Sequence, residues 1–143
     1  MTKGEIAEKL FLEGKNCSTS VVLAFKKELN LEELTLKKMA IGFGGGLGRQ
    51  RLTCGAVSGM CLVLSLLLSD GENKQQIYSI IQSACEEFKK EAGSIICADL
   101  LMGKVEIKNS PVPEERCEEY YKKRPCAELC KIAGNIVERY LNK

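Results

Sequence analysis

Eight cysteines are the residues of this 143-residue chain with the greatest capacity for chemistry. They stand at positions 17, 54, 61, 85, 97, 117, 126 and 130, and the chain contains no histidine. Without histidine, the chain cannot supply a Cys–His nucleophilic pair, a mixed Cys/His zinc site or a histidine ligand to haem. Any chemistry at these positions therefore depends on sulfur, acting as a nucleophile, a disulfide or a metal ligand.

A glycine-rich loop and two arginines precede Cys54. We predict that Thr53 caps a helix whose first turn contains Cys54, where the helix dipole and the unpaired N–H groups favour a thiolate. Arg49 and Arg51 could stabilise such a thiolate or bind an anion, or could simply be solvated loop charges. The loop lacks the G-x-G-x-x-G spacing and the Gly-Lys-Ser/Thr ending of phosphate-binding loops, which argues against a nucleotide site. The loop glycines are Gly42, Gly44, Gly45, Gly46 and Gly48.

Cys17, Cys97 and Cys126 are also predicted to lie in the first turn of a helix. The residues that favour these helix starts are Asn16, Ser94 and Pro125. The three cysteines and Cys54 are far apart in the sequence, so only the fold could bring them together. If the four helix starts converge, their dipoles would help to hold several thiolates at one site. The opposing interpretation is that cysteine is a small hydrophobic residue that is often simply buried.

The other four cysteines have different surroundings. Cys61 and Cys85 lie on apolar helix faces and are predicted to be core residues, whereas Cys117 lies in a polar segment. Cys130 follows Cys126 by one helical turn, so the two thiols share a face and could bind one metal ion. They are a poor disulfide pair, because Cβ atoms at this spacing lie about 5–6 Å apart and a disulfide needs ~3.8 Å. We expect Cys130 to be a core residue.

The hydrophobic pattern predicts an all-α fold, with residues 1–143 forming a single domain of about six helices around a buried central helix. The central helix, at about 53–68, is apolar nearly all the way round and is therefore expected to be buried. Gly55 and Gly59 give it a flat side that another helix could approach closely. Residues 104–124 are predicted to be a polar excursion with one helical turn at about 114–121. The other predicted helices cover about 2–14, 16–30, 31–41, 73–92, 94–103 and 125–141, and in the third of these Leu34, Met39 and Ile41 are expected to point inward.

Composition limits the classes of function. The formal net charge of +2 is too small to indicate nucleic-acid binding. The amino-terminal sequence lacks the basic and then apolar order of a secretory signal. The longest apolar run is shorter than the ~20 residues that cross a bilayer, so no membrane span is expected. We expect a cytoplasmic protein, in which cysteines serve thiol chemistry or metal binding more often than structural disulfides.

The sequence resembles a known family of redox-active proteins that is named for its cysteine pattern, C_GCAxxG_C_C. The similarity extends over most of the chain, and its most specific part is TCGAVSG at residues 53–59. The other matching segments are NCSTSVVLAF around Cys17, the loop GFGGGLGR, GSIICADLLMG around Cys97 and CAELCKIAGNIVERYL from Cys126.

The resemblance implies an all-helical fold and a redox role, without naming a substrate. It also implies that the characteristic cysteines are Cys17, Cys54, Cys97 and Cys126, with Cys130 as a substitute for Cys126. A related helical domain occurs in split-Soret cytochromes, where the cysteine set is linked to an iron–sulfur centre. This chain has no C-x-x-C-H motif, so no haem is expected.

Three hypotheses follow. The first is a thiol-based oxidoreductase in which Cys54 is the low-pKa nucleophile and Cys17, Cys97 or Cys126 resolves the intermediate formed at Cys54. Its redox partner is not identified by the sequence. The second is a [2Fe–2S] or zinc site with the same four cysteines as ligands. The third is a non-catalytic helical interaction module. The glycine loop and the flat side at Gly55 and Gly59 could serve a homodimer.

Overall fold

The computed structural model describes residues 1–143 and consists of helices joined by loops. Six helices have eight residues or more: α1 (Lys3–Leu12), α2 (Cys17–Ala24), α4 (Glu33–Ala40), α6 (Gly55–Leu68), α7 (Lys74–Ala92) and α10 (Cys126–Leu141). The shorter ones are α3 (Lys26–Leu29), the 3₁₀ helix η1 (Ile41–Phe43), α5 (Gly44–Leu47), α8 (Cys97–Leu101) and α9 (Glu118–Lys123). The predicted all-α fold is confirmed.

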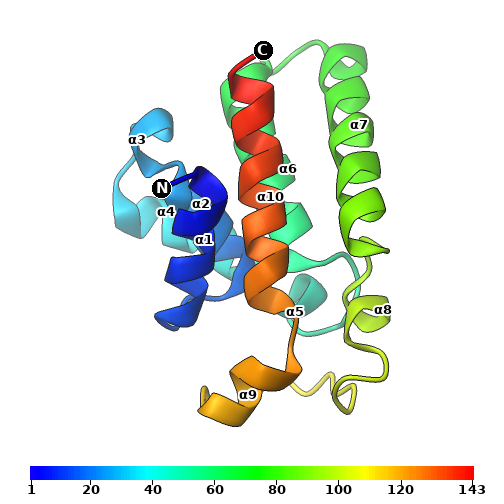
Figure 1. Ribbon diagram of the computed structural model, residues 1–143. Helices are drawn as coiled ribbons and strands as arrows, with labels where there is room; N and C mark the ends of the chain where they lie inside the picture. Colours follow the sequence, from blue (N-terminus) through cyan, green and yellow to red (C-terminus); the bar gives the residue numbers. More distant parts are fainter.

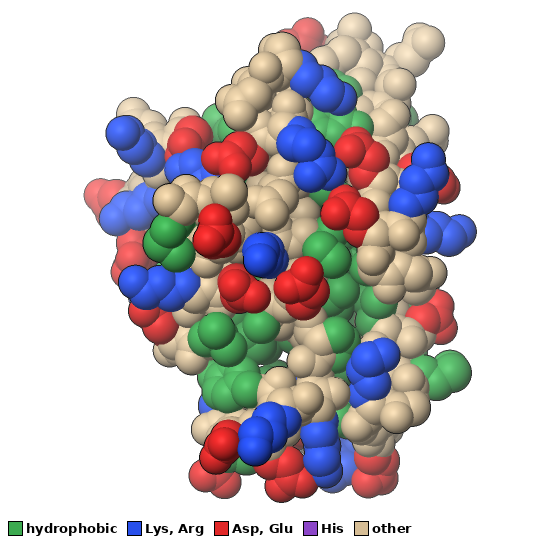
Figure 2. All heavy atoms as spheres, viewed as in Figure 1, with side chains coloured by type: hydrophobic (Ala, Val, Ile, Leu, Met, Phe, Trp, Pro, Cys, Tyr) green, Lys and Arg blue, Asp and Glu red, His purple; other side chains and the backbone are tan.

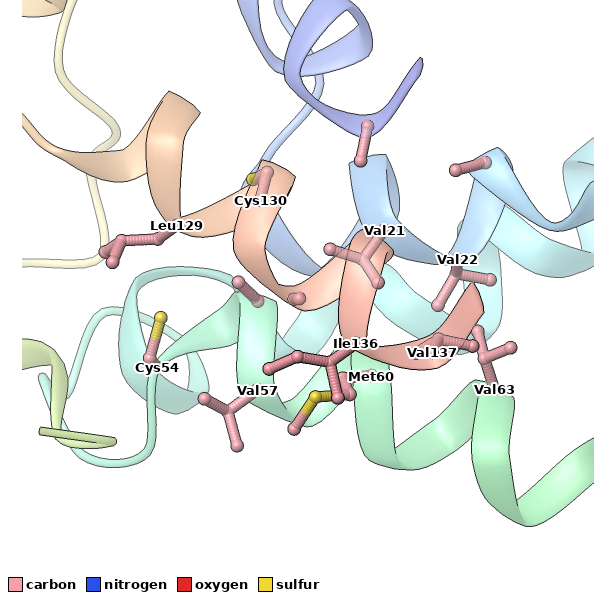
Figure 3. Close-up of a cluster of buried hydrophobic side chains, with 14 of the residues drawn as sticks. Val21, Val22, Cys54, Val57, Met60, Val63, Leu129, Cys130, Ile136 and Val137 are labelled. Carbon is pink, nitrogen blue, oxygen red and sulfur yellow. The ribbon is translucent and has the colours of Figure 1, made fainter. Parts of the chain in front are cut away.

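Three helices, α2, α6 and α10, enclose the centre of the core (Figures 1 and 3). Val21, Met60 and Ile136, one from each helix, are completely buried. Helix α1 packs along α10, and α7 packs against α6 and α10 from the other side (Figure 1). In Figure 3, Cys54, just before α6, and Cys130, on α10, are drawn among the buried side chains of the cluster. The cysteines are therefore an extension of the hydrophobic core.

Helix α6 is the buried central helix that the sequence predicts, and its flat side is used within the chain. A Cβ atom on Gly59 would lie 2.8 Å from the backbone oxygen of Ser18, and one on Gly55 would lie 3.2 Å from the Cβ atom of Cys17. Both neighbours belong to α2, so this helix approaches as closely as the glycines permit. Because α2 occupies the flat side, that side cannot also form a homodimer interface. Near the end of α6, Leu66 is exposed.

The amino-terminal half differs from the predicted boundaries. The predicted helix 16–30 is divided at Phe25, where α2 ends and α3 begins. In α4, Leu36 and Ala40 are buried. Of the three residues predicted to point inward, Met39 packs half-buried against the core, whereas Leu34 and Ile41, which begins η1, are exposed, so the predicted inward face is correct only at Met39. Leu36 and Ala40 are one turn apart and share a face, and Leu34 lies about 200° around the helix from Leu36.

The carboxy-terminal half follows the predicted order more closely. Helix α7 begins after Asn73, whose side chain accepts a hydrogen bond from the Gln76 N–H, and ends at Gly93 in the left-handed conformation. The excursion at 104–124 contains α9, which begins after Cys117 and lies later than the predicted turn. No helix combines the length and the apolar character that a bilayer crossing requires.

Candidate cysteine site

Helix starts position the four family-type cysteines. Cys17, Cys97 and Cys126 are the first residues of α2, α8 and α10, as predicted. Cys54 is the cap that precedes α6, one residue outside the predicted first turn. Thr53, the predicted cap, instead forms an antiparallel bridge with Ile96, just before α8.

This bridge fixes Cys54 and Cys97 on neighbouring backbone segments. The N–H of Cys54 donates to the Ile95 carbonyl at 2.7 Å, and the N–H of Cys97 donates to the Leu52 carbonyl at 2.6 Å. Gly46, at φ +72°, lies directly against this pair, and a Cβ atom there would be 2.7 Å from the Cβ atom of Cys97. Close packing therefore explains the glycine at position 46: without a side chain, the loop backbone can lie directly against the segment that carries Cys97.

A cavity of about 60 Å³ lies between these helix starts. The cysteines that line it are Cys17, Cys54, Cys97 and Cys126. Its other lining side chains are three arginines, Arg51, Arg116 and Arg124, together with apolar groups, Tyr120 and Asn16. The fold thus brings together the four cysteines that stand 37, 43 and 29 positions apart in the sequence.

Cys17 lies close to two further cysteines. Cys17 and Cys126 line the same cavity, and each thiol alters the pKa of the other. The Cys130 thiol donates to the carbonyl oxygen of Cys17 at 3.8 Å, and its side chain is fully buried, as expected for a core residue. Cys130 therefore adjoins the cavity cysteines as a fifth thiol. No group of three or more potential ligand side chains is arranged to hold a metal ion.

Burial makes Cys54 a weak acid. Removal of the side chain from water raises the pKa of the Cys54 thiol to about 12. The backbone N–H groups of Ala56 and Val57, at the start of α6, oppose this rise without cancelling it. The prediction that Cys54 is a low-pKa thiolate is wrong, because desolvation of the charged form outweighs the helix start.

The thiols around Cys17 also favour the protonated form. The Cys126 thiol lowers the pKa of Cys17, but the Cys130 thiol and burial outweigh it, so this pKa is raised well above the ordinary value. The Cys17 thiol and burial raise the pKa of Cys126, while Arg124 and Arg116 oppose the change. Burial likewise raises the pKa of Cys130. At neutral pH these cysteines are neutral thiols.

Arg51 is the charged residue most closely tied to the site. Its residue surface is 7% exposed, which is inconsistent with a solvated loop charge. Its Nε donates to the Lys108 carbonyl at 2.7 Å, and its Nη1 donates to the Cys97 sulfur at 3.8 Å. Burial raises the pKa of Cys97, and Arg51 and Arg124 limit that rise. Arg49 instead forms an ion pair with Glu114 at 3.0 Å.

Sequence reasoning did not identify the residues that the 104–124 excursion contributes. Arg116 stacks on Phe11, with 4.3 Å from its guanidinium carbon to the ring centre, and donates to the Phe11 and Lys15 carbonyls. Arg124 lies 4.4 Å from the Tyr120 ring centre and pairs with Glu114. These contacts fold the excursion over the cavity. A mixed charge run carries no periodic signal that separates these arginines from solvated ones.

The remaining cysteines lie outside the cavity. Cys61 and Cys85 are half-buried between α6 and α7, with their sulfur atoms 3.9 Å apart, so the prediction of two core residues is only partly correct. Cys117, which caps α9, is exposed.

The fold and the site define an all-α protein with a buried thiol cavity flanked by arginines. The chain belongs to the C_GCAxxG_C_C family: the family model described as "Putative redox-active protein (C_GCAxxG_C_C)" matches residues 15–140. The resemblance found in the sequence is thereby confirmed. Comparison with curated proteins found no match. Comparison with solved structures found none either.

Proposed function

We propose that the protein exchanges two electrons through a reversible disulfide between Cys17 and Cys126. The observation that supports this pairing is that both thiols line one small cavity at the starts of α2 and α10, where each alters the pKa of the other. A disulfide needs two neighbouring cysteines, whereas a metal site needs at least three ligands in one place. Membership of a redox-active family agrees with such an exchange.

The electrostatics of the cavity suit a change between two uncharged states. Burial disfavours a thiolate, but the dithiol and the disulfide are both neutral, so neither carries a desolvated charge. A thiolate is needed only while sulfur attacks sulfur. Arg124 and Arg116 oppose the rise in the pKa of Cys126, so Cys126 is the member of the pair with positive charge beside it during that step.

A small disulfide can serve as the oxidant that converts the Cys17/Cys126 dithiol into a disulfide. One cavity thiolate attacks a sulfur of the small disulfide, whose S–S bond breaks and releases one thiol. The second cysteine then attacks the mixed disulfide, forms the internal S–S bond and releases the other thiol. The protein loses two electrons and two protons, and the small disulfide gains them as two thiols.

The test is the rate at which the reduced protein reduces a small disulfide, with each product thiol counted. We expect Cys17→Ser and Cys126→Ser to abolish formation of the internal bridge. Cys130→Ala, the matched control on the same face of α10, is expected to keep it. A Cys130→Ala variant that loses the bridge while Cys126→Ser retains it would disprove this pairing.

A [2Fe–2S] or zinc site remains the second candidate, because four thiols that line one cavity are a suitable donor set and the arginines would offset their charge. Cys17, Cys54, Cys97 and Cys126 would hold such a group, which would supply one-electron transfer if it were an iron–sulfur cluster. The thiols would have to move closer, since no three of them form a ligand group in this structure. Anaerobic purification followed by metal analysis and an absorption spectrum tests this candidate, and colourless, metal-free protein that remains folded in chelator would exclude it.

A further inference from the structure

A second and much larger cavity adjoins the thiol cavity. It measures about 720 Å³, within the range of small-molecule sites. Its lining residues in common with the thiol cavity are Asn16, Gly45, Arg51, Arg116, Tyr120 and Arg124. We call it the cationic chamber. A molecule in the chamber would therefore lie against the same side chains that enclose the cysteines.

The chamber carries a strong excess of positive charge. Its cationic side chains are Lys15, Lys37, Arg49, Arg51, Arg116 and Arg124, and its only acidic one is Glu114. The whole chain has a formal net charge of only +2, so the charge is concentrated here. On the face shown in Figure 2, by contrast, basic and acidic side chains are interspersed. A cavity lined by one sign of charge attracts ligands of the opposite sign.

The lining also contains an unsatisfied polar group. Thr19 lines the chamber and is only 4% exposed, yet its Oγ1 has no hydrogen-bond partner. Buried hydroxyl groups in proteins are normally hydrogen-bonded, because an unpaired one costs about 1–3 kcal/mol. A hydroxyl that can donate to an anion beside the lysines and arginines is consistent with a ligand site.

We propose that the cationic chamber binds the anionic end of the redox co-substrate, a small disulfide that carries carboxylates. This inference rests on the proposed disulfide exchange, and it adds the class of substrate. The carboxylates would lie among the chamber cations while the sulfur atoms reach the cavity through the shared wall. The exchange itself follows the balanced steps given above, with the small disulfide as the electron acceptor.

The kinetic test compares three disulfides as oxidants of the cavity cysteines: oxidised glutathione, which is net negative, neutral hydroxyethyl disulfide and cationic cystamine. We expect the negative disulfide to react about tenfold or more faster than the others at low salt, as for electrostatically steered encounters. The double variant Lys15→Glu/Lys37→Glu should lose this advantage. The matched control, Lys9→Glu/Lys38→Glu, makes the same charge change on α1 and α4 outside the chamber and should keep it. Equal rates for the three disulfides, or equal losses in both variants, would overturn the proposal.

Binding without reaction separates the chamber from the exchange. S-methylglutathione is a thioether that cannot exchange, and its binding to the same proteins is measured by calorimetry. Binding to the wild type and the control, but not to the chamber variant, supports the chamber as a ligand site. If no disulfide oxidises the cysteines, only the proposed function is refuted, and this binding result still stands. Absence of binding to the wild type would overturn the chamber.

A separate pair of thiols supports a second inference. The sulfur atoms of Cys61, on α6, and Cys85, on α7, lie 3.9 Å apart, and both residues are partly exposed. We infer that Cys61 and Cys85 form a second dithiol, which closes into a disulfide between the two helices when a small disulfide oxidises it. The sulfur atoms must approach to about 2.05 Å, which needs local side-chain movement. Two electrons and two protons pass to the oxidant, as in the cavity.

The pair is also polarised. The interaction between the two thiols lowers the pKa of Cys85 and raises the pKa of Cys61. We expect Cys85 to be the sulfur that attacks the oxidant first. Within α7 only Ala84 and Phe88 are fully buried, so a bridge at Cys85 would add a covalent attachment to a lightly anchored helix.

Peptide mapping after treatment with hydroxyethyl disulfide tests the second dithiol. We expect a Cys61–Cys85 bridge in the wild type and also in Cys17→Ser/Cys126→Ser, which lacks the cavity pair. Cys61→Ser should leave Cys85 trapped as a mixed disulfide, and bridge formation should reduce amide hydrogen exchange in α7. Reaction of exposed Cys117 without any Cys61–Cys85 bridge would overturn the inference.

Discussion

Gly59→Ala tests how closely α2 must approach α6 for the cysteine site to form. The added Cβ atom would lie 2.8 Å from the Ser18 backbone oxygen and 3.1 Å from the Val21 Cβ atom, so α2 would have to move. Overpacking of this kind costs about 1–3 kcal/mol. Alanine is favoured over glycine within a helix by about 1 kcal/mol, which offsets part of the cost. We expect a net loss of about 1 kcal/mol in the free energy of unfolding.

Gly42→Ala is the matched control, because a Cβ atom at Gly42 would meet nothing within 4 Å. We expect it to be neutral or to stabilise the protein by up to about 1 kcal/mol. Urea unfolding of both variants, analysed with a common m value, measures the difference. Because Ser18 follows Cys17, the Gly59→Ala protein should also close the cavity disulfide more slowly. A Gly59→Ala protein as stable as Gly42→Ala, with unchanged disulfide closure, would refute the packing argument.

Three further outcomes are expected. In native protein at neutral pH, iodoacetamide should alkylate exposed Cys117 much faster than buried Cys54, with the Cys54 rate still rising towards pH 12, as mass spectrometry of the peptides would show. Folding raises the pKa of Cys54 from 9.0 to about 12, so the unfolded chain loses this proton at a lower pH than the folded protein does. The contribution of Cys54 to the free energy of unfolding is therefore complete below about pH 9 and is lost as the pH rises towards 12. Unfolding curves measured across this range should show a shallower loss of stability for Cys54→Ala than for the wild type. Arg51→Met should slow the alkylation of Cys97 severalfold, because it removes the positive charge that donates to the Cys97 sulfur. The control Arg139→Met, remote from the cavity, should leave the rate unchanged, and equal rates in the two variants would contradict the role of the Arg51–Cys97 hydrogen bond.

The sequence was sufficient to predict the helical architecture and most cysteine positions. Asn73 and Gly93 mark the ends of α7 in the sequence and in the structure, because caps and left-handed glycines act locally. Cys17, Cys97 and Cys126 could be placed at helix starts for the same reason. Their convergence on one cavity was only a hypothesis at that stage, since it depends on how α2, α8 and α10 pack.

The electrostatics of the site could not be predicted in this way. The helix start at Cys54 suggested a thiolate, but its pKa depends on burial by residues distant in the sequence. The role of Arg51 was open because its partners, Cys97 and the Lys108 carbonyl, come from other segments. Arg116 was missed altogether, because its stacking on Phe11 joins residues more than a hundred positions apart.

A redox titration with mapped disulfides tests the central claim most directly. The protein would carry Cys61→Ser, Cys85→Ser and Cys117→Ser, so that only the cavity cysteines and Cys130 can respond, and would be equilibrated with mixtures of reduced and oxidised glutathione. We predict one two-electron transition that coincides with a bridge between Cys17 and Cys126. Buried thiols that all stay reduced across the titration would contradict the account.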